Sequence, residues 1–124
     1  MGSDRKRIGS EGEERAARHL EKQGYRILER NYRAPYGEID LIALDRGELV
    51  FVEVKTRTSD AFGAPQLAVN HRKQERMVKA ALGYLAFKNL HQMPCRFDVV
   101  AISAAGGKEI EVIRNAFAMD RERR

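Results

Sequence analysis

Three ionisable residues, Asp40, Glu53 and Lys55, have types and a spacing that suit the hydrolysis of a phosphodiester bond. Each lies in a stretch that is otherwise rich in apolar residues, so we expect them to be partly buried. Two facing carboxylates repel and raise each other's pKa, and a divalent cation relieves that repulsion. Mg²⁺ takes oxygen ligands and keeps waters for a phosphate substrate. Lys55 would orient the attacking water or stabilise developing charge. The alternative is a salt-bridge cluster at a sheet edge.

The two strands that carry these residues are expected to form an antiparallel hairpin around the turn-forming sequence 45–47. If Leu44 pairs with Leu49 across a four-residue loop, Asp40 falls opposite Glu53. Paired residues point to the same face, so both carboxylates are expected on one face, with Lys55 two residues further along. The opposite face is expected to be wholly apolar, with Ile39, Leu41, Ala43, Val50, Val52 and Val54.

Glu13 is a third candidate carboxylate. It precedes Ala16, Ala17 and Leu20 by three, four and seven residues, which places it on the apolar stripe of a helix. We therefore expect it to point inward and to reach the other two carboxylates. The pattern Ser10-x-x-Glu13 also fits a capping box, and that structural role is the alternative.

Basic side chains follow the acidic segment along the chain. The net charge is +5 over 124 residues; residues 31–60 carry four basic and six acidic groups, and residues 61–95 carry five and one. A basic surface beside carboxylates suits a polyanionic partner. The candidate phosphate-contacting residues are Arg57, Arg72, Lys73, Gln74 and Arg76. The alternative for the residues near 66–90 is an ordinary solvated helix face.

Length and composition exclude several classes of protein. A chain of 124 residues with 43% hydrophobic and 33% charged residues fits one globular domain. No apolar run is long enough to span a membrane, and the first 15 residues do not resemble a secretory signal. Cys95 is the single cysteine, which excludes an internal disulfide. We expect a cytoplasmic protein with no membrane partner.

The elements that position these residues follow the order α-β-β-β-α-β, with a further strand near 109–113. We expect a disordered basic arm over 1–9, a single domain over 10–118 and a charged tail over 119–124. The first helix is expected from Ser10 to Gly24 and the second over about 65–90. The strands are expected over 25–33, 39–44, 49–58 and 97–103. This order predicts an α/β domain with a mixed sheet of four to five strands.

Several longer motifs resemble the bacterial YraN-like family of uncharacterised proteins. The resemblance extends from about Gly9 to Ser103. It is carried by Gly-Glu-Glu-Arg-Ala-Ala at 12–17, Gly24-Tyr25, Asn31-Tyr32-Arg33, Gly-Glu-Ile-Asp-Leu-Ile at 37–42, Phe-Val-Glu-Val-Lys-Thr-Arg at 51–57, Phe62-Gly63 and Arg-Phe-Asp-Val-Val at 96–100.

That family is similar in turn to the PD-(D/E)xK nuclease superfamily, which includes archaeal Holliday-junction resolvases and restriction endonucleases. The resemblance implies a restriction endonuclease-like core. Asp40 matches the first acidic residue of the signature, Glu53 and Lys55 match its (D/E)xK, and Glu13 matches the first-helix glutamate of the resolvases. Ile39 stands where the superfamily usually has proline. The resemblance also implies that the Val54 carbonyl ligates metal.

These observations lead to one function and two alternatives. We expect a Mg²⁺- or Mn²⁺-dependent endonuclease that acts on DNA rather than RNA, on branched or structured DNA in particular. Glu13, Asp40, Glu53 and Val54 would hold the metal, and Lys55 would act in catalysis. By analogy with the resolvases we expect a homodimer. The alternatives are a non-catalytic nucleic-acid-binding module of the same fold and a protein-interaction subunit.

Overall fold

A five-stranded mixed sheet with one helix on each face makes up the computed structural model, which describes residues 2–57, 69–103 and 109–119. Within these ranges, side chains are described from residue 11 onward, except at residue 57. The elements are α1 (Gly2–Lys22), β1 (Arg26–Ala34), β2 (Gly37–Asp45), β3 (Glu48–Arg57), α2 (His71–Phe87), β4 (Cys95–Ser103) and β5 (Ile110–Phe117). This order confirms the predicted α/β class and is consistent with a restriction endonuclease-like core.

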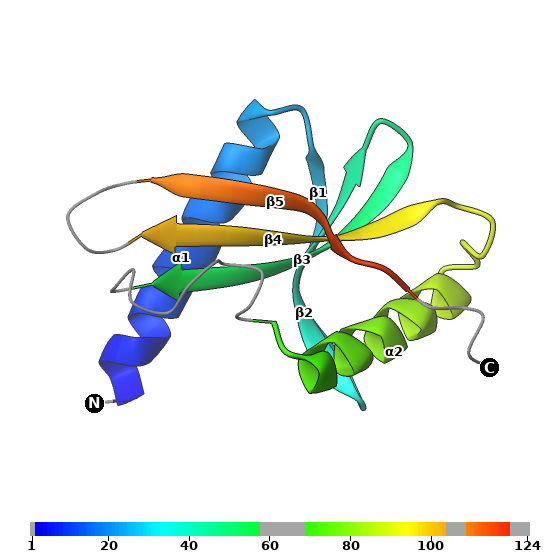
Figure 1. The fold of residues 1–124 in the computed structure, drawn as a ribbon, viewed down its shortest axis with the longest axis horizontal. Coiled ribbons are helices and arrows are strands. Elements are labelled where there is room, and N and C mark those ends of the chain that lie inside the picture. Colours follow the sequence, from blue (N-terminus) through cyan, green and yellow to red (C-terminus); the bar gives the residue numbers. More distant parts are fainter. Residues whose placement is uncertain (1, 58–68, 104–108, 120–124) are drawn as a thin grey trace.

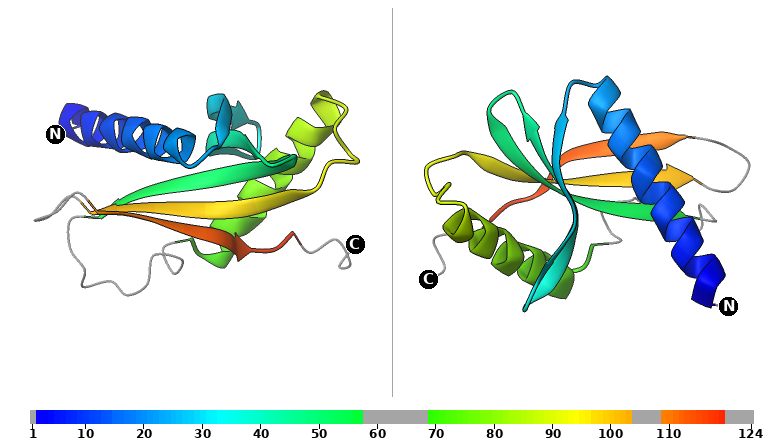
Figure 2. Two further views of the ribbon diagram at one scale, coloured as in Figure 1. Left: turned by 90° about the horizontal axis from the view of Figure 1, so that it is seen from above. Right: turned by 180° about the vertical axis from the view of Figure 1, so that it is seen from behind.

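The strands follow one another across the sheet in chain order. Only β3 and β4 run parallel, and the crossover between them carries α2. The other neighbours are antiparallel. The two helices lie on opposite faces of the sheet (Figure 1 and Figure 2, left). Each face has its own apolar core: α1 packs on Leu41, Val50, Val52, Val100 and Ile102, and α2 packs on Ile42, Leu49, Phe51, Phe97 and Val99.

The pairing of β2 with β3 has the register predicted from the sequence. Leu44 pairs with Leu49, and the ladder continues to Leu41 opposite Val52. The loop is shorter than expected, because Asp45 also pairs with Glu48 and leaves a two-residue turn. Arg46 and Gly47 both have positive φ, 52° and 83°, which is the geometry of a type I′ turn. This turn matches the twist of the two strands and fixes their register.

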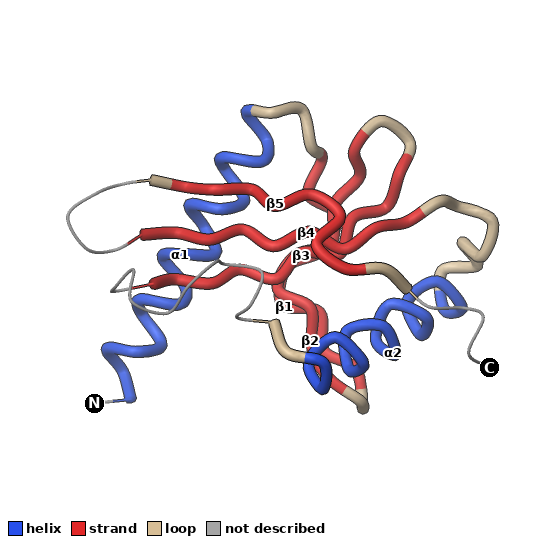
Figure 3. The backbone as a smooth tube through the Cα atoms, in the orientation of Figure 1, coloured by secondary structure: helices blue, strands red, loops and turns tan. Residues whose placement is uncertain are grey.

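Strand β2 leaves β3 at the point where Asp40 and Glu53 lie. Its pairing with β3 ends at Leu41, whereas its pairing with β1 continues through Ile39 to Gly37. The free end of the β1–β2 hairpin reaches the first turns of α2 (Figure 3). The prediction that Ile39 shares a face with Leu41 and Ala43 is therefore wrong: those two residues lie in the core beneath α1, and Ile39 is buried in the core beneath α2. Strict alternation fails there because the strand no longer lies in the plane that β3 defines.

Helix α1 begins earlier than the sequence predicted. It runs from Gly2, so the expected disordered arm over 1–9 is corrected to helix from Gly2 onward, and the capping box at Ser10 is wrong. No proline interrupts residues 2–22, and Arg, Lys and Glu are good helix formers, so Ser10 does not stop the helix. Gly24, with φ 98°, follows the end of the helix as predicted.

Helix α2 is shorter than predicted. It begins at His71, because Asn70 is extended and its side chain accepts a hydrogen bond from the Lys73 amide at 2.9 Å. Asn89, with φ 58°, follows its end in the left-handed region. Residues 65–68 of the predicted helix and residues 120–124 of the predicted tail lie outside the described residues.

Candidate active site

Asp40 and Glu53 are brought together where β2 separates from β3. The register places them one position beyond the last recorded pair of the ladder. Glu53 is buried, with 2% of its surface exposed. The Asp40 carboxylate accepts a hydrogen bond from the Val54 amide at 2.8 Å. Asp40 thus takes the place that a β2 backbone carbonyl would have filled, and it is held directly beside Glu53.

Burial and the neighbouring carboxylates make ionisation of Asp40 unfavourable. Burial is the largest cause and the Glu53 charge is the next, and together they raise the pKa of Asp40 to about 7. The Val54 hydrogen bond and Lys73 oppose this rise, and Glu13 adds to it. A carboxyl group with a pKa near neutrality marks a place where negative charge is concentrated without enough compensation.

Glu13 approaches the same cluster from α1. Gly12 allows the close approach, because a Cβ at this position would collide with the Thr56 hydroxyl of β3. Burial raises the pKa of Glu13, a hydrogen bond from the Asn31 side chain partly offsets the rise, and Glu38 and Glu53 add to it. The structure therefore brings Glu13 within electrostatic reach of Glu53, as the helix periodicity predicted.

Two lysines lie against Glu53 from different elements. Lys55 Nζ is 3.7 Å from Glu53 Oε2, and one third of its side chain is exposed (33%). Lys73, from the first turn of α2, forms an ion pair with the same oxygen. Burial would lower the pKa of Lys73, but Glu53 and Asp40 raise it overall. Lys73 was predicted to contact nucleic acid, and the structure places it inside the carboxylate cluster.

The other predicted basic residues have different surroundings. Arg72 and Arg76 line a cavity with Lys73 at the N-terminal end of α2. The Gln74 side-chain amide donates a hydrogen bond to the Val69 carbonyl at 2.9 Å, so it already binds the backbone just before α2. The side chain of Arg57 lies outside the described residues. A nucleic-acid contact by these four residues stays a prediction.

Asn31 is a site residue that the sequence did not reveal. It lies on β1 opposite Asp40, between the pairs that join Arg30 to Leu41 and Tyr32 to Ile39. Its φ is 52°, a conformation that asparagine tolerates better than most residues. Asn31 belongs to the family motif Asn31-Tyr32-Arg33, which could have drawn attention to it. Strand periodicity, however, does not predict a left-handed backbone conformation at this position.

The donor set fits a hard cation. Every candidate ligand is an oxygen: the carboxylates of Glu13, Asp40 and Glu53 and the Val54 carbonyl. The N–H and C=O of a strand residue point to the same side, so the Val54 amide bond to Asp40 directs its carbonyl there too. Lys73 shows that a cation is accommodated beside Glu53. Among the described residues, however, no three acidic, histidine or cysteine side chains are already arranged as a metal site.

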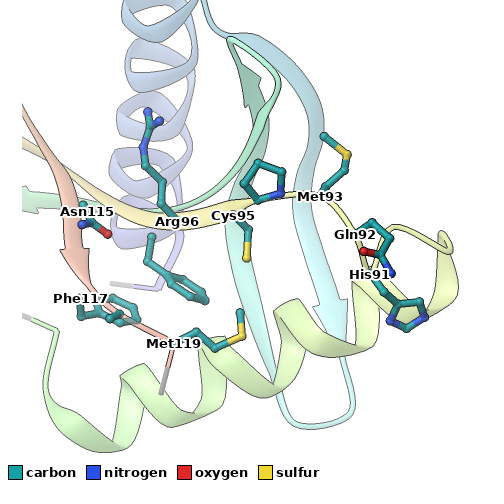
Figure 4. A pocket seen from close by; sticks show the side chains of 11 residues that line it. His91, Gln92, Met93, Cys95, Arg96, Asn115, Phe117 and Met119 are labelled. Atoms are coloured by element: carbon teal, nitrogen blue, oxygen red, sulfur yellow. The ribbon is translucent and has the colours of Figure 1, made fainter. Parts of the chain in front are cut away.

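A larger cavity of about 480 Å³ lies elsewhere, beside the start of β4 and the end of β5. Met93, Cys95, Phe117 and Met119 line it, and Figure 4 shows these side chains together. Its lining contains no carboxylate. This cavity is therefore separate in position and chemistry from the Asp40 and Glu53 cluster.

Comparison with known proteins identifies relatives that align over most of the chain. The sequence model described as "Uncharacterised protein family UPF0102" matches residues 12–102. A UPF0102 protein of Trichlorobacter lovleyi is 51% identical over 120 residues, covering 94% of each chain. One from Syntrophus aciditrophicus is 54% identical over 114 residues, 91% of this chain and 90% of the relative. One from Moorella thermoacetica is 48% identical over 123 residues, 94% of this chain and all of the relative. The matched range includes Glu13, Asp40, Glu53 and Lys55.

Proposed function

The chain belongs to the uncharacterised protein family UPF0102, and we propose that it is a metal-dependent endonuclease that hydrolyses phosphodiester bonds in DNA. The observation that carries the proposal is the pair of carboxylates Asp40 and Glu53. They are held side by side at a break in the β2–β3 ladder, with Lys55 on the same face. A fold gains nothing in stability from two buried carboxylates that repel. A divalent cation between the two carboxylates would relieve their repulsion and would bind a phosphate substrate.

Mg²⁺ or Mn²⁺ would be held by Glu13, Asp40, Glu53 and the Val54 carbonyl. When bound, the ion would supply Lewis-acid activation of the phosphate and lower the pKa of the attacking water. The residues of the chain would then divide the remaining work. Lys55 would orient the water and stabilise charge on the phosphate oxygens. Lys73 would turn from Glu53 toward a substrate phosphate once another cation neutralises that carboxylate.

The surroundings of the site favour a polyanionic substrate. Arg72 and Arg76 line the same cavity as Lys73, so a positively charged surface lies beside the carboxylate cluster. Phosphate contacts of this kind position a nucleic acid without reading its sequence. DNA, and branched or structured DNA in particular, remains the substrate we propose, with a homodimer as the expected assembly. In the described part of the chain, no helix is long and apolar enough to cross a membrane.

The decisive test is to incubate the purified protein with branched, single-stranded and duplex DNA in Mg²⁺ or Mn²⁺ and to measure cleavage. We expect cleavage that Asp40→Asn, Glu53→Gln and Lys55→Ala each reduce at least about 100-fold, since each removes a group at the reacting centre. Glu13→Gln should also reduce it. Glu14→Gln is the matched control, because Glu14 points to Arg30 and Arg18 on the helix surface (2.6 and 3.3 Å).

Absence of cleavage by the folded protein on all three substrates would contradict the proposal, as would cleavage that Asp40→Asn leaves intact. One observation favours a second candidate, a non-catalytic nucleic-acid-binding module. Lys73 already neutralises Glu53, and the described carboxylates do not form a ready metal site. That candidate predicts salt-dependent DNA binding without turnover, and binding that survives Glu53→Ala.

A further inference from the structure

A cavity of about 360 Å³ opens beside the carboxylate cluster, between the end of the β1–β2 hairpin and the first turns of α2. The hairpin and the helix touch here, since a Cβ at Gly37 would lie 3.1 Å from Arg76 Cβ. Lys73 belongs to both the cavity and the ion pair with Glu53. The cavity therefore adjoins the proposed active site through Lys73. Its lining residues are Gly37, Glu38, Asn70, Arg72, Lys73, Arg76 and Met77.

The helix wall of this cavity is positively charged. Arg72 and Arg76 are exposed, and within the described residues neither has an ion-pair partner. They stand four residues apart on α2, so both side chains extend from the same face of the helix. Glu38 is the one carboxylate in the lining, and it is paired with Arg33 at 3.6 Å. Two free guanidinium groups on this wall suit two phosphates of one strand.

The hairpin wall ends in an exposed aromatic ring. Tyr36 lies in the turn of the hairpin, directly before Gly37, and 63% of its surface is exposed. The other exposed large apolar residues among those described are Leu28, Leu82 and Phe87. Phe87 lies at the far end of α2 and has the Lys88 ammonium over its ring at 5.5 Å. Of these residues, only Tyr36 stands next to a residue of the cavity lining along the chain.

We propose that this cavity binds an unpaired segment of a DNA strand, with Arg72 and Arg76 on its phosphates and Tyr36 stacked on a base. The faces of a base inside a duplex are covered by its neighbours, so an aromatic side chain on a hairpin tip stacks only on a base that is free. The substrate class is then DNA with a single-stranded segment beside the bond to be cut. The inference rests on the proposed function, because it takes DNA as the polymer that reaches the site.

The chain contains no tryptophan, so Tyr36→Trp introduces a single fluorescent reporter at the hairpin tip. The variant is titrated without divalent metal, first with a single-stranded oligonucleotide and then with a blunt duplex of the same length. We expect the single strand to quench the fluorescence and the duplex to leave it nearly unchanged. Phe87→Trp, at an exposed aromatic position away from the cavity, is the matched control and should not be quenched by either DNA.

Affinity gives a second readout. Tyr36→Ala should weaken single-strand binding roughly 5- to 150-fold, the range for loss of one stacked base, with little effect on duplex binding. Arg72→Ala and Arg76→Ala should weaken binding and lower its salt dependence. Equal quenching by the duplex, or single-strand affinity unchanged in Tyr36→Ala, would overturn the inference.

The binding result is independent of cleavage. Quenching by the single strand in a protein that never cuts DNA would reject the proposed nuclease and leave the strand-binding site standing. Metal-dependent cleavage that prefers fully paired duplex and ignores Tyr36→Ala would support the nuclease and reject the inference.

Discussion

Carboxylates gather at both ends of the β2–β3 hairpin, and the two clusters have opposite surroundings. Near the turn, Asp45, Glu48 and Asp98 surround Arg96. Five residues along each strand, about 17 Å at 3.3–3.4 Å per residue, Asp40 and Glu53 lie with Glu13 nearby. Both clusters contain three carboxylates and include buried members. They differ in how completely their carboxylates are hydrogen-bonded.

The cluster around Arg96 is fully hydrogen-bonded. The guanidinium contacts Asp45 at 2.8 Å, Glu48 at 2.7 Å and Asp98 at 3.0 Å. Asp98, which is wholly buried, also accepts from the Tyr25 hydroxyl at 3.1 Å and from the Asn115 amide at 2.9 Å. A rigid, bidentate donor at the centre satisfies each carboxylate geometrically. This cluster joins the segment between α1 and β1, the hairpin turn and β4.

Within the described part of the chain, the cluster at Asp40 has no such central donor. Lys73 and Lys55 both lie against Glu53, and among the described residues the one hydrogen bond to the Asp40 carboxylate comes from the Val54 backbone amide. Burial, and after it the charge of Glu53, raise the pKa of Asp40 to about 7. The difference teaches that carboxylate residues alone do not mark a functional site. The informative feature is a buried carboxyl group whose ionisation the surroundings disfavour, as at Asp40.

Removal of the central arginine is expected to have the largest effect on stability. Arg96→Met leaves three carboxylates without their shared partner, two of them buried, and should lower the free energy of unfolding by roughly 3–5 kcal/mol in urea titrations. Arg30→Met is the matched control, because Arg30 makes an exposed ion pair with Glu14 and should change stability by less than about 1 kcal/mol. Equal losses in the two variants would show that the Arg96 network is not a major source of stability.

The same substitution in the two clusters should change stability in opposite directions. The ordinary pKa of Asp40 is 3.8 and its folded value is about 7, so the folded protein loses stability as pH rises through this range. One pKa unit corresponds to about 1.4 kcal/mol, which sets the loss at about 4 kcal/mol at most. Without metal, Asp40→Asn should equal the wild type near pH 4 and be more stable by about 1–4 kcal/mol at pH 8.

Asp45→Asn is the control for this comparison. It weakens a satisfied ion pair with Arg96, so it should be destabilising by roughly 1–3 kcal/mol at pH 8. Urea titrations at pH 4, 6 and 8 follow both variants. A loss of stability in Asp40→Asn at pH 8 would contradict the claim that the Asp40 cluster is electrostatically unfavourable.

The sequence predicted those parts of the fold that depend on local periodicity. Alternating apolar residues on either side of Arg46-Gly47 were enough to predict the β2–β3 register, and with it the neighbourhood of Asp40 and Glu53. Glu13 followed from helical spacing. The start of α1 was wrong, because a capping pattern at Ser10 does not stop a helix whose preceding residues also favour helix.

The missed features depend on contacts between elements that are distant along the chain. Ile39 lies on the face opposite to the predicted one, because β2 bends away from β3 toward α2. Lys73 and Glu53 are separated along the chain by the crossover between β3 and α2. No sequence pattern predicts that their side chains form an ion pair. Asn31 enters the site through a left-handed residue inside a strand. Such positions are set by tertiary packing rather than by the propensity of each residue.

The smallest expected effect is a change in the pH dependence of cleavage, and it compares two asparagines. Each of them donates a hydrogen bond to a carboxylate, one in each cluster. Asn31 and Asn115 both have positive φ, 52° and 53°, which glycine adopts without strain. Asn115 serves its cluster through its backbone amide, which donates to Asp98, whereas Asn31 acts on Glu13 through its side chain. Asn31→Gly therefore keeps the backbone and removes the hydrogen bond, and the pKa of Glu13 rises further above its ordinary value.

If Glu13 holds the metal as proposed, it must be ionised to do so, and the acid limb of the cleavage profile should then move to higher pH in Asn31→Gly. A net hydrogen bond is worth about 0.5–1.5 kcal/mol, so we expect roughly two- to tenfold slower cleavage at pH 6 and unchanged cleavage at pH 9. Asn115→Gly keeps its backbone donor and should leave the profile in place. If both variants gave the wild-type profile, the role of Asn31 would be limited to its backbone conformation. The hydrogen bond from its side chain would then not be needed for Glu13 to ionise.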